Sequence, residues 1–155
     1  MYKALIIDFS RVLIFAHQDV DSLNEHHRKL SMNYEYEVLD YFYLNKDLIK
    51  YLESIKNRVE IYLFSDGALH AVTELENRVQ HLFKQTVTAE ELGLKKSDPQ
   101  AHRELLKKLK VSADETIFVD DKDKNIAAAR VAGMQAVQFI DNDQIIPRLE
   151  QLLAG

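Results

Sequence analysis

Short apolar runs recur along this chain, and polar residues follow each of them. The four runs are Ala4–Ile7, Val59–Phe64, Thr116–Val119 and Ala136–Ile140. Because these runs are mostly apolar rather than strictly alternating, each predicts a β-strand that is buried on both faces. Helical patterns fall between the runs, so we predict an α/β fold. Its centre would be a three-layer arrangement with a parallel sheet of about five strands and helices on both faces.

Four segments between or after these runs show the spacing of amphipathic helices with recognisable ends. Gly133 predicts a left-handed end for the third helix, and Pro147 must lie in the first turn of the fourth helix or kink it. The predicted helices begin after Asn45, span Asp98 to about Lys110, cover Ile126–Ala132, and cover Ile145–Leu153.

The segment 15–44 interrupts this alternation between the first strand and the Asn45 helix. It predicts two helices, around Asp21–Leu30 and Glu35–Tyr43, and we expect its aromatic residues to pack it onto the core. The aromatic residues and histidines of the segment include Tyr34, Tyr36, Tyr41, Phe42, Tyr43, His17, His26 and His27. We therefore expect residues 1–155 to form one domain with 15–44 inserted in it.

Composition narrows the class of protein. Hydrophobic residues make up 46% of the chain and charged residues 29%, which is typical of globular proteins. The net charge of -5 gives no electrostatic reason to expect nucleic acid or an anionic membrane as a partner. The chain has no cysteine, and polar residues interrupt its apolar N-terminal stretch. We therefore expect a cytoplasmic protein without disulfides, signal peptide or membrane span.

Candidate chemistry lies where the apolar runs end. Asp8, Ser65 and the pair Asp120 and Asp121 directly follow three runs, and Lys96 precedes the Asp98 helix. Ligands of open parallel sheets bind beyond the carboxyl ends of the strands, so these side chains are expected to meet there. Clustered carboxylates repel one another unless a hard cation such as Mg²⁺ neutralises them. A hydroxyl and an ammonium group beside that cation would suit a phosphoryl group.

Four segments resemble, in order, the four motifs of the haloacid dehalogenase (HAD) superfamily, whose members are mostly Mg²⁺-dependent phosphatases that form an aspartyl-phosphate. These segments are Ile6–Leu13, Phe64–Gly67, Lys96–Pro99 and Val119–Asn125. The following segment, Asn125–Met134, is similar to the helix that usually comes after the fourth motif. The resemblance implies a Rossmann-like sheet with a small helical cap, formed here by residues 15–44, inserted after the first strand.

The resemblance also implies roles for individual residues. Catalytic roles fall on Asp8 as nucleophile and on Ser10, Ser65 and Lys96. Phosphate binding falls on Ser65, Asp66 and Lys96, and Mg²⁺ binding on Asp8, the Ser10 carbonyl, Asp120 and Asp121. The expected partner is a small phosphorylated metabolite, and the sequence does not indicate an oligomeric state.

Two positions depart from the family pattern. Ser10 stands where the family's phosphatases usually have the aspartate that acts as general acid and base, and Arg11 replaces the usual glycine. General acid–base catalysis is worth roughly 10² to 10⁴ in rate. The main hypothesis is therefore a phosphatase, with weak activity, that acts on a small phosphomonoester. The alternative is a regulatory protein that binds Mg²⁺ and phosphate without turnover.

Two further classes fit less well. A true dehalogenase uses the same nucleophile but needs no metal, so the acidic pair Asp120 and Asp121 argues against it. A response-regulator receiver also combines acids, a hydroxyl and a lysine around Mg²⁺. In receivers, however, the acidic pair comes first along the chain, whereas here it comes last.

Overall fold

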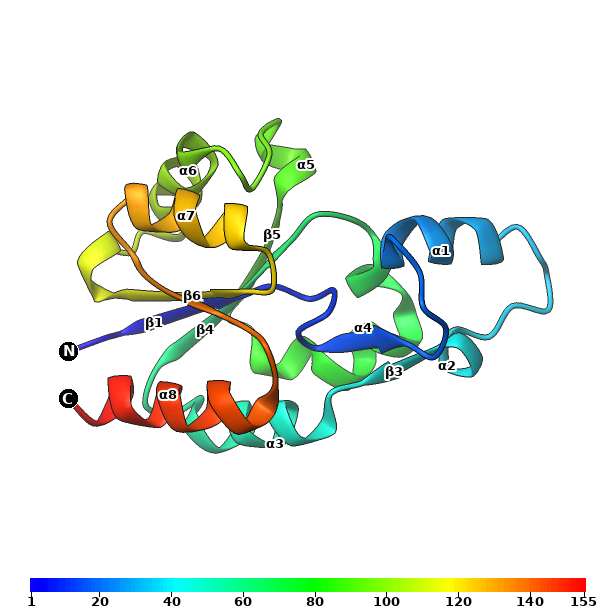
Figure 1. The fold of residues 1–155 in the computed structure, drawn as a ribbon, viewed down its shortest axis with the longest axis horizontal. Helices are drawn as coiled ribbons and strands as arrows, with labels where there is room; N and C mark the ends of the chain where they lie inside the picture. Colours follow the sequence, from blue (N-terminus) through cyan, green and yellow to red (C-terminus); the bar gives the residue numbers. More distant parts are fainter.

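The four apolar runs form strands of one parallel sheet in the computed structural model, which describes residues 1–155 (Figure 1). The strand order is β5-β4-β1-β6-β7, with every neighbouring pair parallel. The strands are β1 (Ala4–Ile7), β4 (Glu60–Ser65), β5 (Gln85–Thr88), β6 (Thr116–Asp120) and β7 (Gln135–Gln138). The predicted α/β class and the number of strands are confirmed.

The fifth strand, β5, has no continuous apolar run, and the sequence pattern did not reveal it. It lies at the edge of the sheet and pairs only with β4. Val87 is its one fully buried side chain, whereas Gln85 and Thr86 are exposed. An edge strand contacts fewer apolar neighbours than a central strand, so its composition is under weaker constraint.

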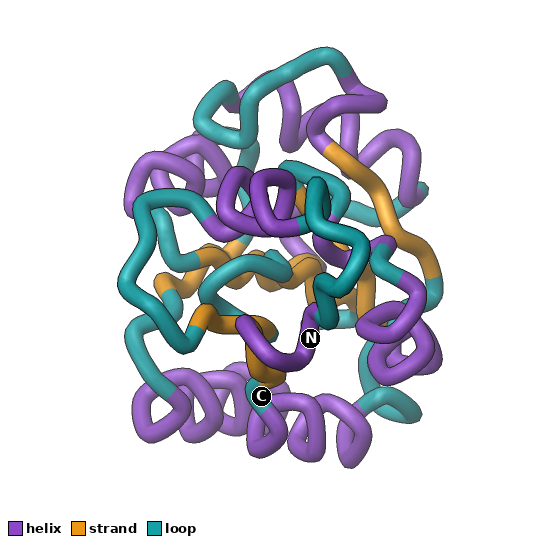
Figure 2. The backbone as a smooth tube through the Cα atoms, turned by 90° about the vertical axis from the view of Figure 1, so that its right-hand side faces the viewer, coloured by secondary structure: helices purple, strands orange, loops and turns teal.

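Helices cover both faces of the sheet (Figure 2). One face packs against α3 (Lys46–Ile55), α4 (Thr73–Val79) and α8 (Asn142–Ala154). The other face packs against α5 (Ala89–Leu92), α6 (Pro99–Leu109) and α7 (Asp123–Val131). Along β1, Leu5 and Ile7 enter the first core, while Ala4 and Ile6 enter the second. Burial on both faces thus explains why the run is continuously apolar.

The helix ends follow local rules. Asn45 accepts a hydrogen bond from the Leu48 N–H, as predicted for a cap, and Gly133 has a φ of 96° after α7. Pro147 lies in the second turn of α8 rather than the first, because α8 begins at Asn142. Single 3₁₀ turns occur at Leu69–Ala71 (η1), Gln80–Leu82 (η2) and Ala113–Glu115 (η3). No helix is both long and apolar enough to cross a bilayer.

The segment between β1 and α3 differs from its prediction. It contains β2 (Ile14–Ala16), α1 (Leu23–Leu30), the short α2 (Val38–Tyr41) and β3 (Phe42–Leu44). The first predicted helix is confirmed as α1. The second, around Glu35–Tyr43, is wrong over much of its length because Phe42–Leu44 pairs with Ile14–Ala16 as an antiparallel hairpin. Phe42 is buried and Tyr43 is exposed, which is the alternation of a strand.

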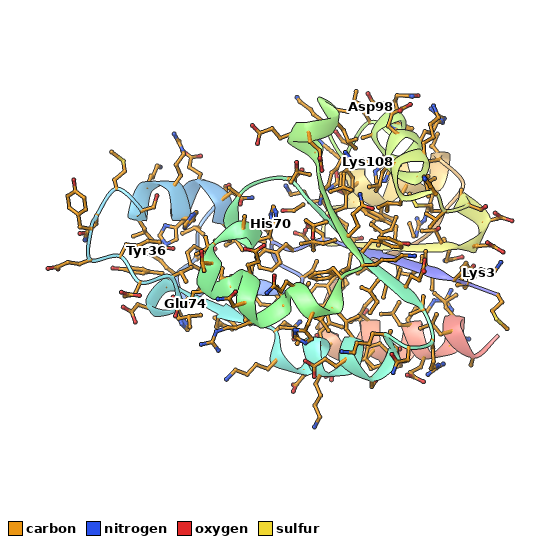
Figure 3. All side chains as sticks on the ribbon, turned by 180° about the vertical axis from the view of Figure 1, so that it is seen from behind. Lys3, Tyr36, His70, Glu74, Asp98 and Lys108 are labelled. Carbon is orange, nitrogen blue, oxygen red and sulfur yellow. The ribbon has the colours of Figure 1, made fainter.

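The insertion lies at the end of the molecule opposite the two termini (Figure 1). Seen from behind, Tyr36 of the insertion and Lys3 near the N-terminus mark the two ends (Figure 3). The strand β1 runs from the Lys3 end toward the insertion. The insertion therefore covers the carboxyl end of the sheet, where the candidate residues lie.

Candidate active site

The predicted site residues gather at the ends of three neighbouring strands. The register pairs Ile7 of β1 with Leu63 of β4 and with Val119 of β6. Asp8 therefore leaves the sheet between Ser65 and Asp120, although the three residues are far apart along the chain. We call Asp8, Lys96 and Asp120 the floor of the site.

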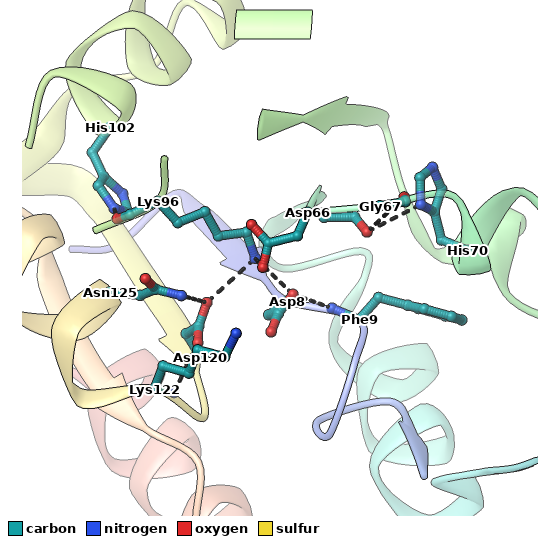
Figure 4. Close-up of polar contacts among 11 residues, drawn as sticks. Asp8, Phe9, Asp66, Gly67, His70, Lys96, His102, Asp120, Lys122 and Asn125 are labelled. Carbon is teal, nitrogen blue, oxygen red and sulfur yellow. Dashed lines mark hydrogen bonds and ion pairs between the residues drawn. The ribbon is translucent and has the colours of Figure 1, made fainter. Parts of the chain in front are cut away.

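Asp8 is the centre of this floor (Figure 4). Its Oδ1 accepts hydrogen bonds from Lys96 Nζ at 2.6 Å and from the Phe9 N–H at 2.8 Å. Its Oδ2 accepts no hydrogen bond. Burial raises the pKa of Asp8 to about 7, while the neighbouring Lys96 ammonium acts in the opposite direction. Asp8 thus presents one anchored oxygen and one oxygen that is free to react or to bind a cation.

Lys96 links Asp8 to Asp120 through ion pairs with both carboxylates. The Lys96 side chain is about 1% exposed, and its Nζ lies 3.3 Å from Asp120 Oδ2. Asp120 also accepts hydrogen bonds from Asn125 Nδ2 at 3.0 Å and from the Lys122 N–H at 2.9 Å. Burial lowers the pKa of Lys96, but the carboxylates around it outweigh burial and raise that pKa above its ordinary value. Lys96 therefore remains a cation inside the protein.

Asp121 completes an acidic cluster. Asp8, Asp120 and Asp121 each place a carboxylate oxygen within 4.8 Å of the others. Burial, followed by repulsion from Asp120, raises the pKa of Asp121 to about 6. The Asp121 carboxylate accepts no hydrogen bond from another residue, and the Ser10 carbonyl accepts none of the bonds that close the 9–14 turn. These free oxygens fit a hard divalent cation, which prefers oxygen ligands.

A small hollow of about 60 Å³ opens above the floor. Its walls carry predicted site residues on one side and the start of the insertion helix α1 on the other. From the site these are Asp8, Ser10, Asp66 and Asp121, and from the insertion they are Asp21, Ser22, Leu23 and Asn24. Ser22 caps α1 by accepting a hydrogen bond from the Glu25 N–H at 3.2 Å. We call this small space the catalytic hollow.

Arg11 links the hollow to the insertion. Its φ of 60° lies in the left-handed region, where a glycine would be unstrained and a residue with a Cβ is not. Its guanidinium donates to the Val20 carbonyl and, at 3.1 Å, to the Asp21 carbonyl. The Arg11 guanidinium is therefore held by backbone carbonyls of the insertion.

The second motif is placed differently from the others. Ser65 Oγ donates to the Gly67 carbonyl at 3.3 Å and lies 3.0 Å from His70 Nδ1, so its hydroxyl points away from the catalytic hollow. Asp66 does line that hollow, and its half-exposed carboxylate is 4.0 Å from Lys96 Nζ. The structure therefore brings together every predicted site residue, except that the Ser65 hydroxyl faces His70.

Three supporting residues were not among the predicted site residues: Asn125, His70 and His102. His102 is fully buried, and its Nε2–H donates to the Lys96 carbonyl at 2.6 Å, which holds the loop that carries Lys96. Its ring lies edge-on between Phe64 and Phe118. His102 is the polar exception on the buried stripe of α6, and this exception is the signal that could have identified it.

A family model for haloacid dehalogenase-like hydrolases matches residues 4–133. The chain belongs to the haloacid dehalogenase-like hydrolases. Two relatives are named phosphatases. A sesquiterpene phosphatase, astK, of Aspergillus oryzae is 39% identical over 61 residues, which are 39% of this chain and 31% of the relative. A glyceraldehyde 3-phosphate phosphatase of Methanopyrus kandleri is 36% identical over 62 residues, 39% of this chain and 27% of the relative. The chain thus matches less than a third of the length of either.

Solved structures of HAD enzymes share the whole fold. A predicted HAD-like hydrolase from Porphyromonas gingivalis has a TM-score of 0.74 at 16% identity, with 100% of this chain and 99% of that chain covered. The HAD enzyme bt-2542 of Bacteroides thetaiotaomicron, solved with magnesium and inorganic phosphate, has a TM-score of 0.71 at 15% identity, with 94% and 98% covered. At such identities the likeness establishes the fold alone.

Proposed function

We propose that this chain is a Mg²⁺-dependent phosphatase of small phosphomonoesters and that Asp8 is its nucleophile. The observation that carries the proposal is the free Oδ2 of Asp8, a carboxylate whose Oδ1 is bound by the buried Lys96 and which forms an acidic cluster with Asp120 and Asp121. The phosphatase names of two relatives and the magnesium and phosphate in a structural neighbour support it. Family membership makes a hydrolase the expected class.

The Ser10 carbonyl and the Asp121 carboxylate would hold Mg²⁺ through oxygens that are free of other bonds, together with the Asp8 carboxylate oxygen that does not attack phosphorus. Asp120 was also a predicted ligand, but both of its oxygens already accept hydrogen bonds, so we propose that it holds Lys96 and Asn125 in place. Bound Mg²⁺ would neutralise the carboxylates and withdraw charge from the phosphoryl oxygens.

In the first step, Asp8 attacks phosphorus, the bond from phosphorus to the leaving oxygen breaks, and the leaving alkoxide takes a proton from water. Lys96 and the Ser65 hydroxyl balance the charge on the phosphoryl oxygens, the latter after giving up its bond to the Gly67 carbonyl. In the second step, water attacks the phosphorus of the acyl phosphate. Inorganic phosphate leaves, and the Asp8 carboxylate is restored.

Ser10 limits both steps. It lines the catalytic hollow at the place of the family's usual acid and base, and a serine hydroxyl is a poor donor and acceptor of protons at neutral pH. The first step should therefore be fastest with leaving groups that need no proton and slow with alkoxides. The second step lacks a base for water, so the aspartyl-phosphate should accumulate.

Rapid acid quench and mass spectrometry after mixing with p-nitrophenyl phosphate or acetyl phosphate test the proposal. We expect an adduct of about 80 Da on the wild-type chain with Mg²⁺, the mass gained on phosphorylation. The Asp8→Asn variant should lack it, whereas the exposed Asp114→Asn control should keep it. An adduct that survives in Asp8→Asn would refute the assigned nucleophile.

Ser10 also favours a second candidate, a regulatory protein that binds Mg²⁺ and phosphate without turnover. Calorimetry with Mg²⁺ and inorganic phosphate distinguishes the two. Binding by the wild type, with neither adduct nor turnover in the wild type and in Ser10→Asp, would establish this second function and reject the phosphatase. We further propose that residues 15–44 act as a reduced cap over the hollow, since Ser22 and Asn24 form part of its wall.

A further inference from the structure

A second, larger hollow adjoins the catalytic one. Its volume is about 690 Å³, which is in the range of small-molecule sites, and no apolar residue lines it. It shares Ser22, Asn24, Asp66 and Lys122 with the catalytic hollow, and the buried Lys96 also lines it. A molecule whose phosphoryl group reaches Asp8 can therefore extend into this space, which we call the basic hollow.

The charges of the basic hollow are unbalanced. Four lysines line it, Lys95, Lys96, Lys122 and Lys124. Lys96 is paired with Asp8 and Asp120, which leaves three lysines against the two carboxylates of Asp66 and Asp123. This excess of positive charge occurs in a chain whose net charge is -5. A concave surface of one charge sign concentrates ligands of the opposite sign.

Three of these lysines have no carboxylate partner. Lys95, Lys122 and Lys124 are exposed and take part in no ion pair. Other surface lysines, among them Lys50 and Lys56, also lack an ion pair, so the distinguishing feature of the basic hollow is that three unpaired lysines line one opening. The three ammonium groups come from the loop before α6 and from the N-terminal end of α7, and all three line the same opening. They are therefore available to an anion in the hollow.

Another groove also adjoins the catalytic hollow, with which it shares Asp21 and Asp121. It is lined partly by apolar residues, among them Phe15, Leu23, Tyr43 and Phe139, and it also includes Asp19. The cation of that groove, Arg11, is already bound to carbonyl groups. An anionic leaving group would be repelled by this groove and attracted by the basic hollow.

We propose that the substrate carries a second anionic group on its leaving portion and that Lys95, Lys122 and Lys124 bind that group. The second group is a phosphate or a carboxylate, so the substrate class is a small bisphosphate or a phosphorylated acid. This inference rests on the proposed function for the orientation of the substrate, since it takes Asp8 as the point at which the transferred phosphoryl group binds.

Matched ligand pairs test the inference by calorimetry in the Asp8→Asn background with Mg²⁺, where no turnover depletes the ligand. One pair is 3-phosphoglycerate and glycerol 3-phosphate, which differ by a carboxylate. The other is fructose 1,6-bisphosphate and fructose 6-phosphate, which differ by a phosphate. We expect the ligand with the second anion to bind on the order of tenfold more tightly in at least one pair. The pair with the larger ratio identifies the anion.

The double substitution Lys95→Gln with Lys124→Gln should reduce that ratio to near one. The matched control, Lys50→Gln with Lys56→Gln, removes the same charge from exposed, unpaired lysines of α3 and its C-cap and should keep the ratio. A ratio near one in the Asp8→Asn parent, or a ratio that survives the Lys95 and Lys124 substitutions, overturns the inference. Neither result bears on the adduct at Asp8, and loss of the adduct does not alter the ratio, so the two proposals fail separately.

Discussion

The floor of the site and the insertion above it differ in burial and in how tightly their residues are bonded. Asp8, Lys96 and Asp120 are almost completely buried and are bonded to one another. In the insertion, Met32 is 84% exposed and Tyr34 is fully exposed. The floor is held by the sheet, where a change in one residue affects all its partners. The insertion touches the site through few residues, so it can vary without disturbing the reactive groups.

Lys96→Met should have the largest effect, because it removes the cation that balances two buried carboxylates. Losing one partner of a buried ion pair typically costs about 3–5 kcal/mol. We expect a loss of that size in the free energy of unfolding, measured by urea denaturation in metal-free buffer. Lys50→Met on the exposed face of α3 is the control. A change as small as the control would mean that the floor does not depend on its charges.

Ser10→Asp is expected to have the next largest effect, on activity rather than stability. The substitution places a carboxyl group, which can act as general acid and base, at position 10 beside the floor of the site. Turnover of p-nitrophenyl phosphate should rise on the order of 10²-fold. The acid-quench adduct should decline in parallel, because its hydrolysis becomes faster. Faster turnover with an unchanged adduct would show that hydrolysis of the aspartyl-phosphate is not the slow step.

Asp121→Asn should stabilise the metal-free protein, and the effect should depend on pH. Burial and Asp120 raise the pKa of Asp121 from 3.8 to about 6 in the folded state, so the folded state binds more protons than the unfolded state between these values. Stability from this group is present at low pH and falls as pH rises through that window. Asp121 is partly exposed, so solvent screens the repulsion. The free energy of unfolding of the variant should therefore exceed that of the wild type by about 1 kcal/mol above pH 6, which corresponds to a rise in Tm of roughly 2–4 °C.

Thermal melts of wild type and Asp121→Asn across the pH range measure this difference directly. The variant should gain stability above pH 6 and lose its advantage near pH 4. Added Mg²⁺ should reverse the order, because it binds the folded wild type more tightly than the variant. A variant that is less stable than the wild type in metal-free buffer at neutral pH would show that Asp121 has a structural role.

Tyr34→Ala in the insertion is expected to have the smallest effect. The Tyr34 side chain is exposed and packs against nothing, so the change in free energy of unfolding should stay within about 0.5 kcal/mol. Turnover of p-nitrophenyl phosphate should be unchanged. A large loss of either quantity would show that the tip of the insertion supports the site and would remove the contrast with the floor.

The sequence by itself determined the central sheet and the composition of the site. Ala4–Ile7, Ile61–Phe64 and Ile117–Val119 of strands β1, β4 and β6 are apolar because both faces of the sheet are covered, and a polar residue ends each run at the carboxyl edge of the sheet. Parallel pairing then brings Asp8, Ser65 and Asp120 to one edge. These conclusions need only local patterns and the geometry of a parallel sheet.

Only the tertiary structure decided the remaining features. The edge strand β5 and the hairpin of β2 and β3 depend on partners distant in the chain, so their own residues carry a weak signal. Three side-chain contacts also depend on the assembled fold: the hydrogen bond from His102 to the Lys96 carbonyl, the contact of His70 with Ser65, and the hydrogen bond from Arg11 to a carbonyl of the insertion. The basic hollow likewise forms where segments far apart in sequence meet. Such contacts are absent from any local pattern, because side-chain direction and packing are set only after the elements have assembled.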